Sequence, residues 1–121
     1  MYRYVTIEED YQGIIKETNQ YGLYYSIFKD INDKKKYLIN LFESDDCIIF
    51  YAYKPNTNSN AFYFENLSFE KFIFFLKYFK YDLQILEFCL KNYDDSYRFC
   101  VSYDMDNNGN ILKTAIFSLL D

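Results

Sequence analysis

Residues 47–65 read CIIFYAYKPNTNSNAFYFE, and this stretch decides the fold. Its two outer segments, residues 47–53 and 61–65, are rich in aromatic and β-branched side chains, which favour strands. The polar loop between them, which contains Pro55, can close a hairpin. We therefore expect two antiparallel strands here, each contributing aromatic rings to a core.

A second hairpin is predicted over residues 97–103 and 111–119. In the first of these segments, aromatic or branched apolar residues alternate with Arg, Cys and Ser, a pattern typical of a half-buried strand. The Asn108-Gly109 step between the segments supplies a tight turn.

The clearest helix begins at Ser68, a suitable N-cap, with Leu67 and Phe72 at the two hydrophobic-staple positions. From there apolar residues recur at alternating spacings of three and four. This periodicity predicts one long helix to about Lys91, or two helices if the chain breaks at Lys80-Tyr-Asp82. The expected fold is therefore α+β: an antiparallel sheet of hairpins packed on one long helix, which that break would divide.

The first 45 residues fit more than one structure. Thr6-Ile-Glu-Glu9 has the spacing of a capping box, but Gly13 would weaken the following helix by about 1 kcal/mol relative to Ala. Residues 23–28 and 37–42 fit either a strand or a helix. The regular spacing of turn signals along the chain favours strands for both.

Length and composition indicate a single globular domain over residues 1–121, since no Pro/Gly/Ser-rich linker divides the chain. With 18 acidic and 13 basic residues and a net charge of −5, it suits a basic protein partner better than nucleic acid. The N-terminal residues contain no apolar run of signal-peptide length. Three cysteines, Cys47, Cys89 and Cys100, fit buried thiols of a reducing compartment. We therefore expect a soluble cytoplasmic protein without a membrane segment.

The residue types present exclude most familiar catalytic systems. The sequence has no histidine, which removes His-based acid–base catalysis, Ser-His-Asp and Cys-His nucleophiles, and His metal ligands. Its 3 glycines form neither a dinucleotide-binding nor a phosphate-binding loop. No CxxC pair is present to hold zinc. We expect no catalytic residue, no metal site and no cofactor.

One motif partly resembles a metal site. Residues 104–109 match the first, third and fifth ligand positions and the glycine of an EF-hand calcium loop. The position that needs a bidentate Glu is Ala115, and the flanking segments are predicted strands. A hairpin tip is therefore the preferred interpretation, with weak calcium capture as the alternative, and we expect calcium to leave the fold unchanged.

Two acidic turns lie next to tyrosines and are the candidate partner-binding sites. The first acidic cluster comprises Glu43, Asp45, Asp46, Tyr51 and Tyr53, and the second comprises Tyr93, Asp94, Asp95 and Tyr97. Tyrosine supplies rigid apolar area and a hydroxyl, while carboxylates meet Lys or Arg on a basic surface. The first cluster is preferred, because Tyr51 and Tyr53 share strand parity and hence one face. Solvated turns are the plainer interpretation of both clusters.

Taken together, these features resemble one class of protein. Lys, Asn, Ile, Tyr and Phe are abundant and Ala, Gly, Pro and Trp are scarce, which is the residue usage that AT-rich codons supply. Together with small size, acidity, tyrosine clusters and missing catalytic groups, this usage resembles small acidic immunity proteins of bacterial polymorphic and contact-dependent toxin systems. The resemblance implies a non-catalytic inhibitor that occludes a basic toxin, commonly a nuclease. The alternatives are a phage-encoded inhibitor of a bacterial defence system and a small-molecule-binding domain. The last would need an aromatic pocket between helix and sheet.

Overall fold

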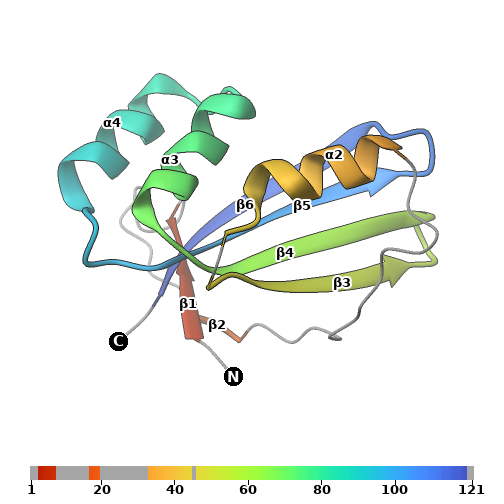
Figure 1. The fold of residues 1–121 in the computed structure, drawn as a ribbon, viewed down its shortest axis with the longest axis horizontal. Coiled ribbons are helices and arrows are strands. Elements are labelled where there is room, and N and C mark those ends of the chain that lie inside the picture. The colour runs from red at the N-terminus through yellow and green to blue at the C-terminus, as the bar shows by residue number, and fades with distance from the viewer. Residues whose placement is uncertain (1–2, 8–16, 20–32, 45, 120–121) are drawn as a thin grey trace.

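The computed structural model describes residues 3–7, 17–19, 33–44 and 46–119. Its elements are β1 (Arg3–Thr6), β2 (Glu17–Asn19), α2 (Asp33–Phe42), β3 (Ile48–Lys54), β4 (Ser59–Leu67), α3 (Phe69–Tyr78), α4 (Leu83–Asn92), β5 (Phe99–Asp106) and β6 (Ile111–Leu119). The strands pair antiparallel in the order β2-β1-β6-β5-β4-β3. The three described helices form a layer over the sheet, with α3 contacting α2, α4 and β5 (Figure 1). The expected α+β class is confirmed.

Both predicted hairpins are present. β3 pairs with β4 along its whole length, and β5 pairs with β6. Gly109 in the second turn has a φ of 85°, which L side chains rarely adopt. A Cβ at this position would also lie 2.8 Å from Cδ of Lys34 in α2. The backbone conformation therefore favours glycine at this turn, whereas the flexible Lys34 side chain could shift to make room for a Cβ.

Side-chain caps begin both helices of the 68–92 region. As predicted, Oγ of Ser68 accepts a hydrogen bond from the Lys71 amide at 3.3 Å and so caps α3. Oδ1 of Asp82 accepts one from the Gln84 amide at 2.8 Å and caps α4. The second cap explains why a new helix starts here.

The single long helix predicted through this region is wrong, because α3 ends before Asp82 in a Schellman motif. The Tyr81 amide donates to the Leu76 carbonyl at 3.0 Å, and the Lys80 amide donates to the Lys77 carbonyl at 3.2 Å. Lys80 has a φ of 53°, in the left-handed region. The helix therefore ends and a new one begins across residues 80–82. This is the alternative of two helices that the sequence left open.

The strand predicted for residues 37–42 is also wrong, because these residues form the second half of α2. The side chains of Leu38, Ile39 and Phe42 are buried, whereas those of Tyr37 and Asn40 are exposed. This is helical spacing, since a strand would place alternate residues on one face. The three lysines that precede them are good helix formers. The predictions for residues 8–16 and 23–28 lie outside the described residues.

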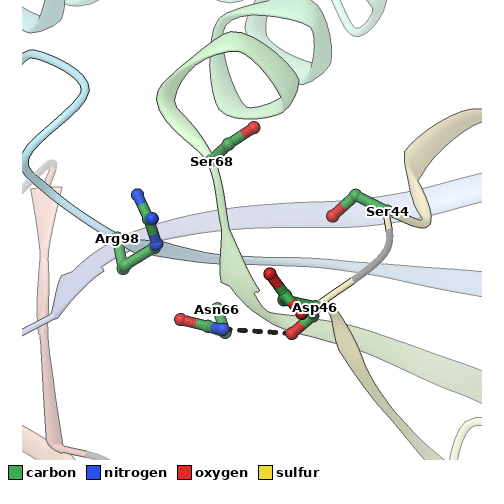
Figure 2. Close-up of a pocket in the computed structure, with 5 residues that line it drawn as sticks. All are labelled: Ser44, Asp46, Asn66, Ser68 and Arg98. Atoms are coloured by element: carbon green, nitrogen blue, oxygen red, sulfur yellow. Dashed lines mark hydrogen bonds between the residues drawn. The ribbon is translucent and has the colours of Figure 1, made fainter.

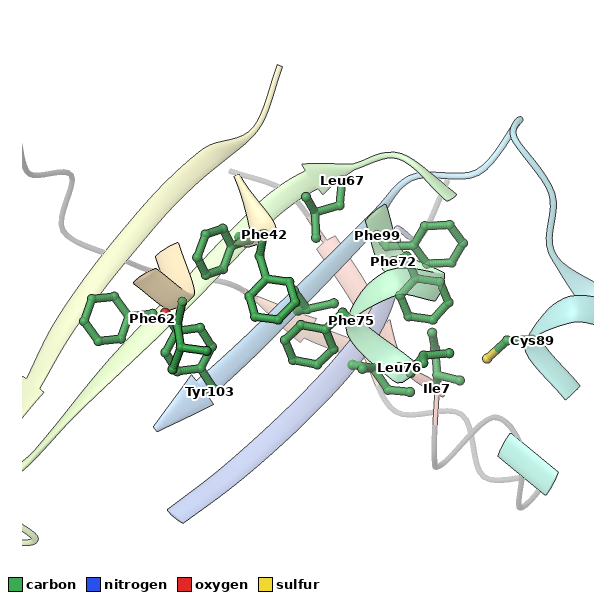
Figure 3. Packing of buried hydrophobic residues seen from close by; sticks show 14 of the residues in the cluster. Ile7, Phe42, Phe62, Leu67, Phe72, Phe75, Leu76, Cys89, Phe99 and Tyr103 are labelled. Atoms are coloured by element: carbon green, nitrogen blue, oxygen red, sulfur yellow. The ribbon is translucent and has the colours of Figure 1, made fainter. Parts of the chain in front are cut away.

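The main core lies between the helices and one face of the sheet (Figure 3). Its fully buried rings are Phe42, Phe62, Phe64, Phe72, Phe75, Phe99 and Tyr103. Phe72 of α3 stacks on Phe99 of β5, with ring centroids 4.0 Å apart. Phe42 of α2 lies 4.9 Å from Phe75 of α3. Aromatic pairs of this kind add about 0.5–1.5 kcal/mol to the effect of area burial.

Part of the opposite face of the sheet is buried as well. Cys100 of β5 and Phe117 of β6 form a second buried cluster on it. Glu65 of β4 also lies on this face, is 1% exposed, and has no hydrogen-bond partner at either carboxylate oxygen. Burial raises the pKa of Glu65 to about 7. β5 was expected to be half-buried, with one face exposed. Cys100 and Ser102 on that face are buried, as are Phe99, Val101 and Tyr103 on the other, so that expectation is wrong.

Candidate partner-binding surface

The two acidic turns lie at one end of the sheet. Glu43 and Asp46 lie between α2 and β3, Asp94 and Asp95 lie between α4 and β5, and all four are exposed. β3 and β5 each pair antiparallel with β4. Their first residues therefore lie at the same end of the sheet, and so do the turns that lead into them.

Arg98 lies between these turns. Figure 2 shows it across a hollow from Asp46, with Asn66 between them. The hollow has a volume of about 210 Å³, and its lining residues are Ser44, Asp46, Asn66, Ser68 and Arg98. Arg98 also lines a second hollow of about 350 Å³, together with Ser96, Tyr97 and Leu119. We call this surface the acidic end and define it by Glu43, Asp46, Asp94, Asp95, Tyr97 and Arg98.

Hydrogen bonds within the turn before β5 hold it in one conformation. The Ser96 hydroxyl and amide both donate to Oδ1 of Asp94, the amide at 2.9 Å, and these bonds lower the pKa of that carboxyl. The Tyr97 amide donates to the Asp94 carbonyl at 3.1 Å. Nη1 of Arg98 donates to the carbonyls of Asp95 and Tyr97 at 3.2 and 3.1 Å. A surface fixed in this way loses less conformational freedom when a partner binds.

Tyr97 is the exposed ring of the acidic end. It is 39% exposed, and its ring makes an edge contact with Tyr93 at a centroid distance of 5.1 Å. Tyr93 is buried in the main core and contacts Phe99 at 5.5 Å. Of the two tyrosines in the second acidic cluster, Tyr97 therefore offers contact area and Tyr93 supports it.

The first acidic cluster is divided between the two ends of β3. Glu43 and Asp46 precede the strand, whereas Tyr53 is the sixth residue of β3. At about 3.3 Å per residue, Tyr53 lies about 17 Å from the start of the strand. Asp45 is outside the described residues. The structure therefore does not bring Tyr53 to the carboxylates with which the sequence grouped it.

The two tyrosines of β3 share one face, as their parity predicts. Tyr51 is half-buried against the main core, and its hydroxyl donates to Oδ1 of Asn60. Tyr53 is 52% exposed, and its hydroxyl donates to Oδ1 of Asn58 at 2.8 Å. Tyr51 is thus mainly a packing residue, and Tyr53 is an exposed ring at the far end of the sheet.

Sequence reasoning missed Arg98 and Asn66. Asn66 has a φ of 62° at the irregularity in the pairing of β4 with β5, and its side-chain amide donates to the Asp46 carbonyl at 3.0 Å. It therefore fixes the turn before β3 to β4. The available signals were weak: asparagine tolerates the left-handed region, and Arg98 follows the Asp94-Asp95 pair closely in the sequence.

The carboxylates matched to a calcium loop are engaged within the second hairpin. Asp104 forms an ion pair with Lys54 at 2.8 Å. Asp106 accepts hydrogen bonds from the amides of Asn110 and Asn108, both at 2.9 Å, and the Asn110 bond is the main cause of its lowered pKa. The predicted hairpin tip is confirmed. Among the described residues, no three Cys, Asp or Glu side chains are grouped so as to hold a metal ion.

The three cysteines are free thiols. Cys89 and Cys100 are buried as predicted, and Cys47 is half-buried. Burial raises the pKa of Cys47 to about 12 and places that of Cys100 well above its usual value. Because the thiolate is the reactive form, both side chains are poor nucleophiles at neutral pH.

No protein-family model matches this chain, and no curated protein or solved structure matches it. In the part of the chain that the structure describes, no helix is long and apolar enough to span a membrane. Any proposal for its function therefore depends on the geometry of its surfaces.

Proposed function

We propose that this chain is a non-catalytic inhibitor that binds one basic protein and neutralises it, as the immunity protein of a toxin nuclease does. The observation that supports the proposal is the position of two acidic turns at one end of the sheet, with Tyr97 exposed beside Arg98. Carboxylates at the rim of an interface attract a basic partner and raise its association rate. Inhibition by steric occlusion of the partner's active site needs no chemistry from this chain.

Tyr97 is the proposed anchor of this interface. Its ring lies against buried Tyr93, and its own turn is held by the hydrogen bonds to Asp94. Buried aromatic anchors mainly determine the dissociation rate of a complex. Tyr53 is exposed enough to be an anchor, but its hydroxyl is hydrogen-bonded to Asn58 and the acidic turns lie at the other end of β3.

Arg98 has a positioning role in this proposal. Its guanidinium donates to two carbonyls of the turn that carries Asp94 and Asp95. In that position it holds the turn and lies across the hollow from Asp46. A basic partner therefore meets carboxylates on both sides of one guanidinium.

The test begins with the protein encoded by the reading frame next to this gene. We expect that protein to be a basic toxin whose nuclease activity is lost when this chain is added. Association and dissociation rates are then measured at two salt concentrations. The variant carrying Asp94→Asn and Asp95→Asn should associate more slowly and with a flatter salt dependence, whereas Glu87→Gln, an exposed change on α4, should not.

The anchor is tested with a matched pair of exposed tyrosines. Tyr97→Ala should cost roughly 2 kcal/mol or more of binding free energy, the usual size for an anchor residue. Tyr53→Ala, at the far end of β3, should change it little. An effect of Tyr53→Ala alone would return the interface to the first acidic cluster. A neighbouring protein that is neither bound nor inhibited would refute the proposed function.

A further inference from the structure

The turn between β5 and β6 holds the one Asn-Gly step of the sequence, Asn108-Gly109. Asn108 is exposed at the tip of the hairpin, and Gly109 has a φ of 85°. An asparagine side chain is most reactive when glycine follows it, because glycine has no Cβ to keep its nitrogen away from the side-chain carbonyl carbon. Every other asparagine of the chain precedes a larger residue. The chemistry of the sequence therefore singles out Asn108 for covalent change.

Asp106 holds this turn through both its main chain and its side chain. The Gly109 amide donates to the carbonyl oxygen of Asp106 at 3.1 Å. Oδ1 of Asp106 accepts hydrogen bonds from the amides of Asn108 and Asn110, both at 2.9 Å. Oδ2 accepts one from Nδ2 of Asn110 at 3.2 Å. The nitrogen that would have to react, that of Gly109, is thus engaged as a hydrogen-bond donor.

Two further features oppose reaction at the Gly109 nitrogen. The Gly109 amide is one of the donors that lower the pKa of Asp106, and the same carboxylate charge opposes loss of the amide proton. The aliphatic part of Lys34, from α2, lies against Gly109, where an added Cβ would be 2.8 Å from Cδ of Lys34. Gly109 is buried beneath it. Reaction at this nitrogen therefore requires the turn to open locally.

We propose that Asn108 is a self-modification site, at which the side-chain amide is converted to a carboxylate, and that Asp106 is the positioning residue that slows this conversion in the folded chain. When the turn opens, the Gly109 nitrogen forms a bond to Cγ of Asn108 and closes a cyclic imide. The bond from Cγ to the side-chain nitrogen breaks, and that nitrogen leaves as ammonia with the proton given up by the Gly109 amide. Water then opens the ring at either of its carbonyls, which gives aspartate or isoaspartate.

Both products change the turn. Each adds a carboxylate close to Asp106, and covalent changes of charge act on structure through the same electrostatic rules as other charges. In isoaspartate the main chain also runs through Cγ, which alters the spacing of the amides that donate to Asp106. The inference is independent of the proposed function, because this turn follows the end of β5, whereas the turn that carries Asp94 and Asp95 precedes its start.

The test incubates the purified full chain at mildly alkaline pH and follows each asparagine by peptide mapping and mass spectrometry. Asn107 is an internal control, because it is also exposed but precedes asparagine. Conversion at Asn108 should be roughly tenfold faster than at Asn107 or more, a factor that corresponds to a modest difference in barrier. The products should include both aspartate and isoaspartate. Equal rates at the two residues, or aspartate alone, would overturn the proposed route.

Matched variants test the role of Asp106. Asp106→Ala removes the carboxylate that accepts from the turn amides and should speed conversion at Asn108 by roughly tenfold. Asp106→Asn keeps an acceptor oxygen and should speed it less. Asp104→Ala is the control, because the Asp104 carboxylate pairs with Lys54, and it should leave the rate unchanged. Circular dichroism confirms that each variant is folded.

Unfolding the original chain in urea gives the rate without the turn, and it should exceed the rate in the folded chain. Equal rates in urea and in buffer would show that the turn gives no protection. No acceleration with either Asp106 variant would have the same meaning. Acceleration by Asp104→Ala equal to that by Asp106→Ala would trace the effect to general loosening of the hairpin. Each of these results would overturn the role assigned to Asp106.

Discussion

Both faces of the sheet bury side chains, but the buried polar groups on the two faces differ in charge. Among the described residues, the buried side-chain polar groups without a hydrogen-bond partner are the neutral hydroxyl of Tyr103, on the helix-covered face, and the carboxyl group of Glu65, on the opposite face. A buried neutral group without a partner costs about 1–3 kcal/mol, whereas a buried charge costs more unless it takes up a proton. The larger buried cluster lies on the helix-covered face. The buried carboxyl group on the opposite face makes stability depend on pH.

The largest expected effect concerns packing on the helix-covered face. Phe72 is fully buried and stacks on Phe99. Phe72→Ala should lower the free energy of unfolding by about 3–5 kcal/mol, as is usual for large core aromatics. Leu112→Ala, an exposed apolar residue of β6, should change it by less than about 0.5 kcal/mol. Urea unfolding measures both, and similar losses would mean that this face is not the main source of stability.

The next effect comes from the carboxyl group of Glu65. Its pKa is about 7 in the folded chain against an ordinary value of 4.5. Because the folded state holds the proton more tightly, the free energy of unfolding falls as pH rises from about 4.5 to about 7, by up to about 3 kcal/mol. Urea unfolding at pH 5 and pH 8 should show the chain less stable at the higher pH.

Glu65→Gln should remove most of this difference between pH 5 and pH 8. Asp94 and Asp106 do not interfere. Their pKa values are lowered in the folded chain, so the stability that their ionised carboxylates contribute is lost only below about pH 4. If Glu65→Gln keeps the same pH dependence as the original chain, another group causes it and the contrast between the two faces is not electrostatic.

A smaller effect is expected at Tyr103. Its ring stacks between Phe62 and Phe64, at centroid distances of 5.2 and 5.9 Å, and its hydroxyl is buried without a partner. Tyr103→Phe keeps the ring and removes the hydroxyl, so it should raise the free energy of unfolding by about 1 kcal/mol. This gain should be the same at pH 5 and pH 8, unlike the change at Glu65. A loss of stability would show that the hydroxyl has a partner in solution, such as water.

Local signals in the sequence were enough to predict the two hairpins and the start of α3. Asn108-Gly109 forms a turn and Ser68 caps a helix through bonds to residues close in sequence. These signals can therefore be recognised without knowledge of the tertiary fold. α2 was misassigned because Leu38, Ile39 and Phe42 fit a strand as well as a helix until the buried set is known. Which of these residues are buried depends on contacts of α2 with α3 and the sheet, and a single sequence does not show those contacts.

The candidate surfaces show the same limit. The acidic and tyrosine residues could be grouped in sequence, but the position of both turns beside Arg98 depends on β4 lying between β3 and β5. Glu65 looked like an ordinary polar residue at the end of a strand. Burial of the second face of the sheet is what raises its pKa, and that burial is a property of the whole fold.

An effect no larger than that at Tyr103 separates backbone strain from side-chain packing on the helix-covered face. Lys80 has a φ of 53° where α3 ends, a conformation that costs an L residue about 1–2 kcal/mol and glycine almost nothing. Glycine also gains entropy in the unfolded chain, so Lys80→Gly should stabilise by less than the full strain, about 1 kcal/mol or a rise of roughly 4 °C in Tm. Lys80→Ala removes the same charge but keeps the Cβ, and should bring no such gain. Because Lys80 is exposed at the end of α3 and Glu65 lies on the face of the sheet away from the helices, the gains from Lys80→Gly and Glu65→Gln should add at pH 8. A gain from Lys80→Ala equal to that from Lys80→Gly would trace the effect to the lysine charge, and the strain assigned to this turn would be wrong.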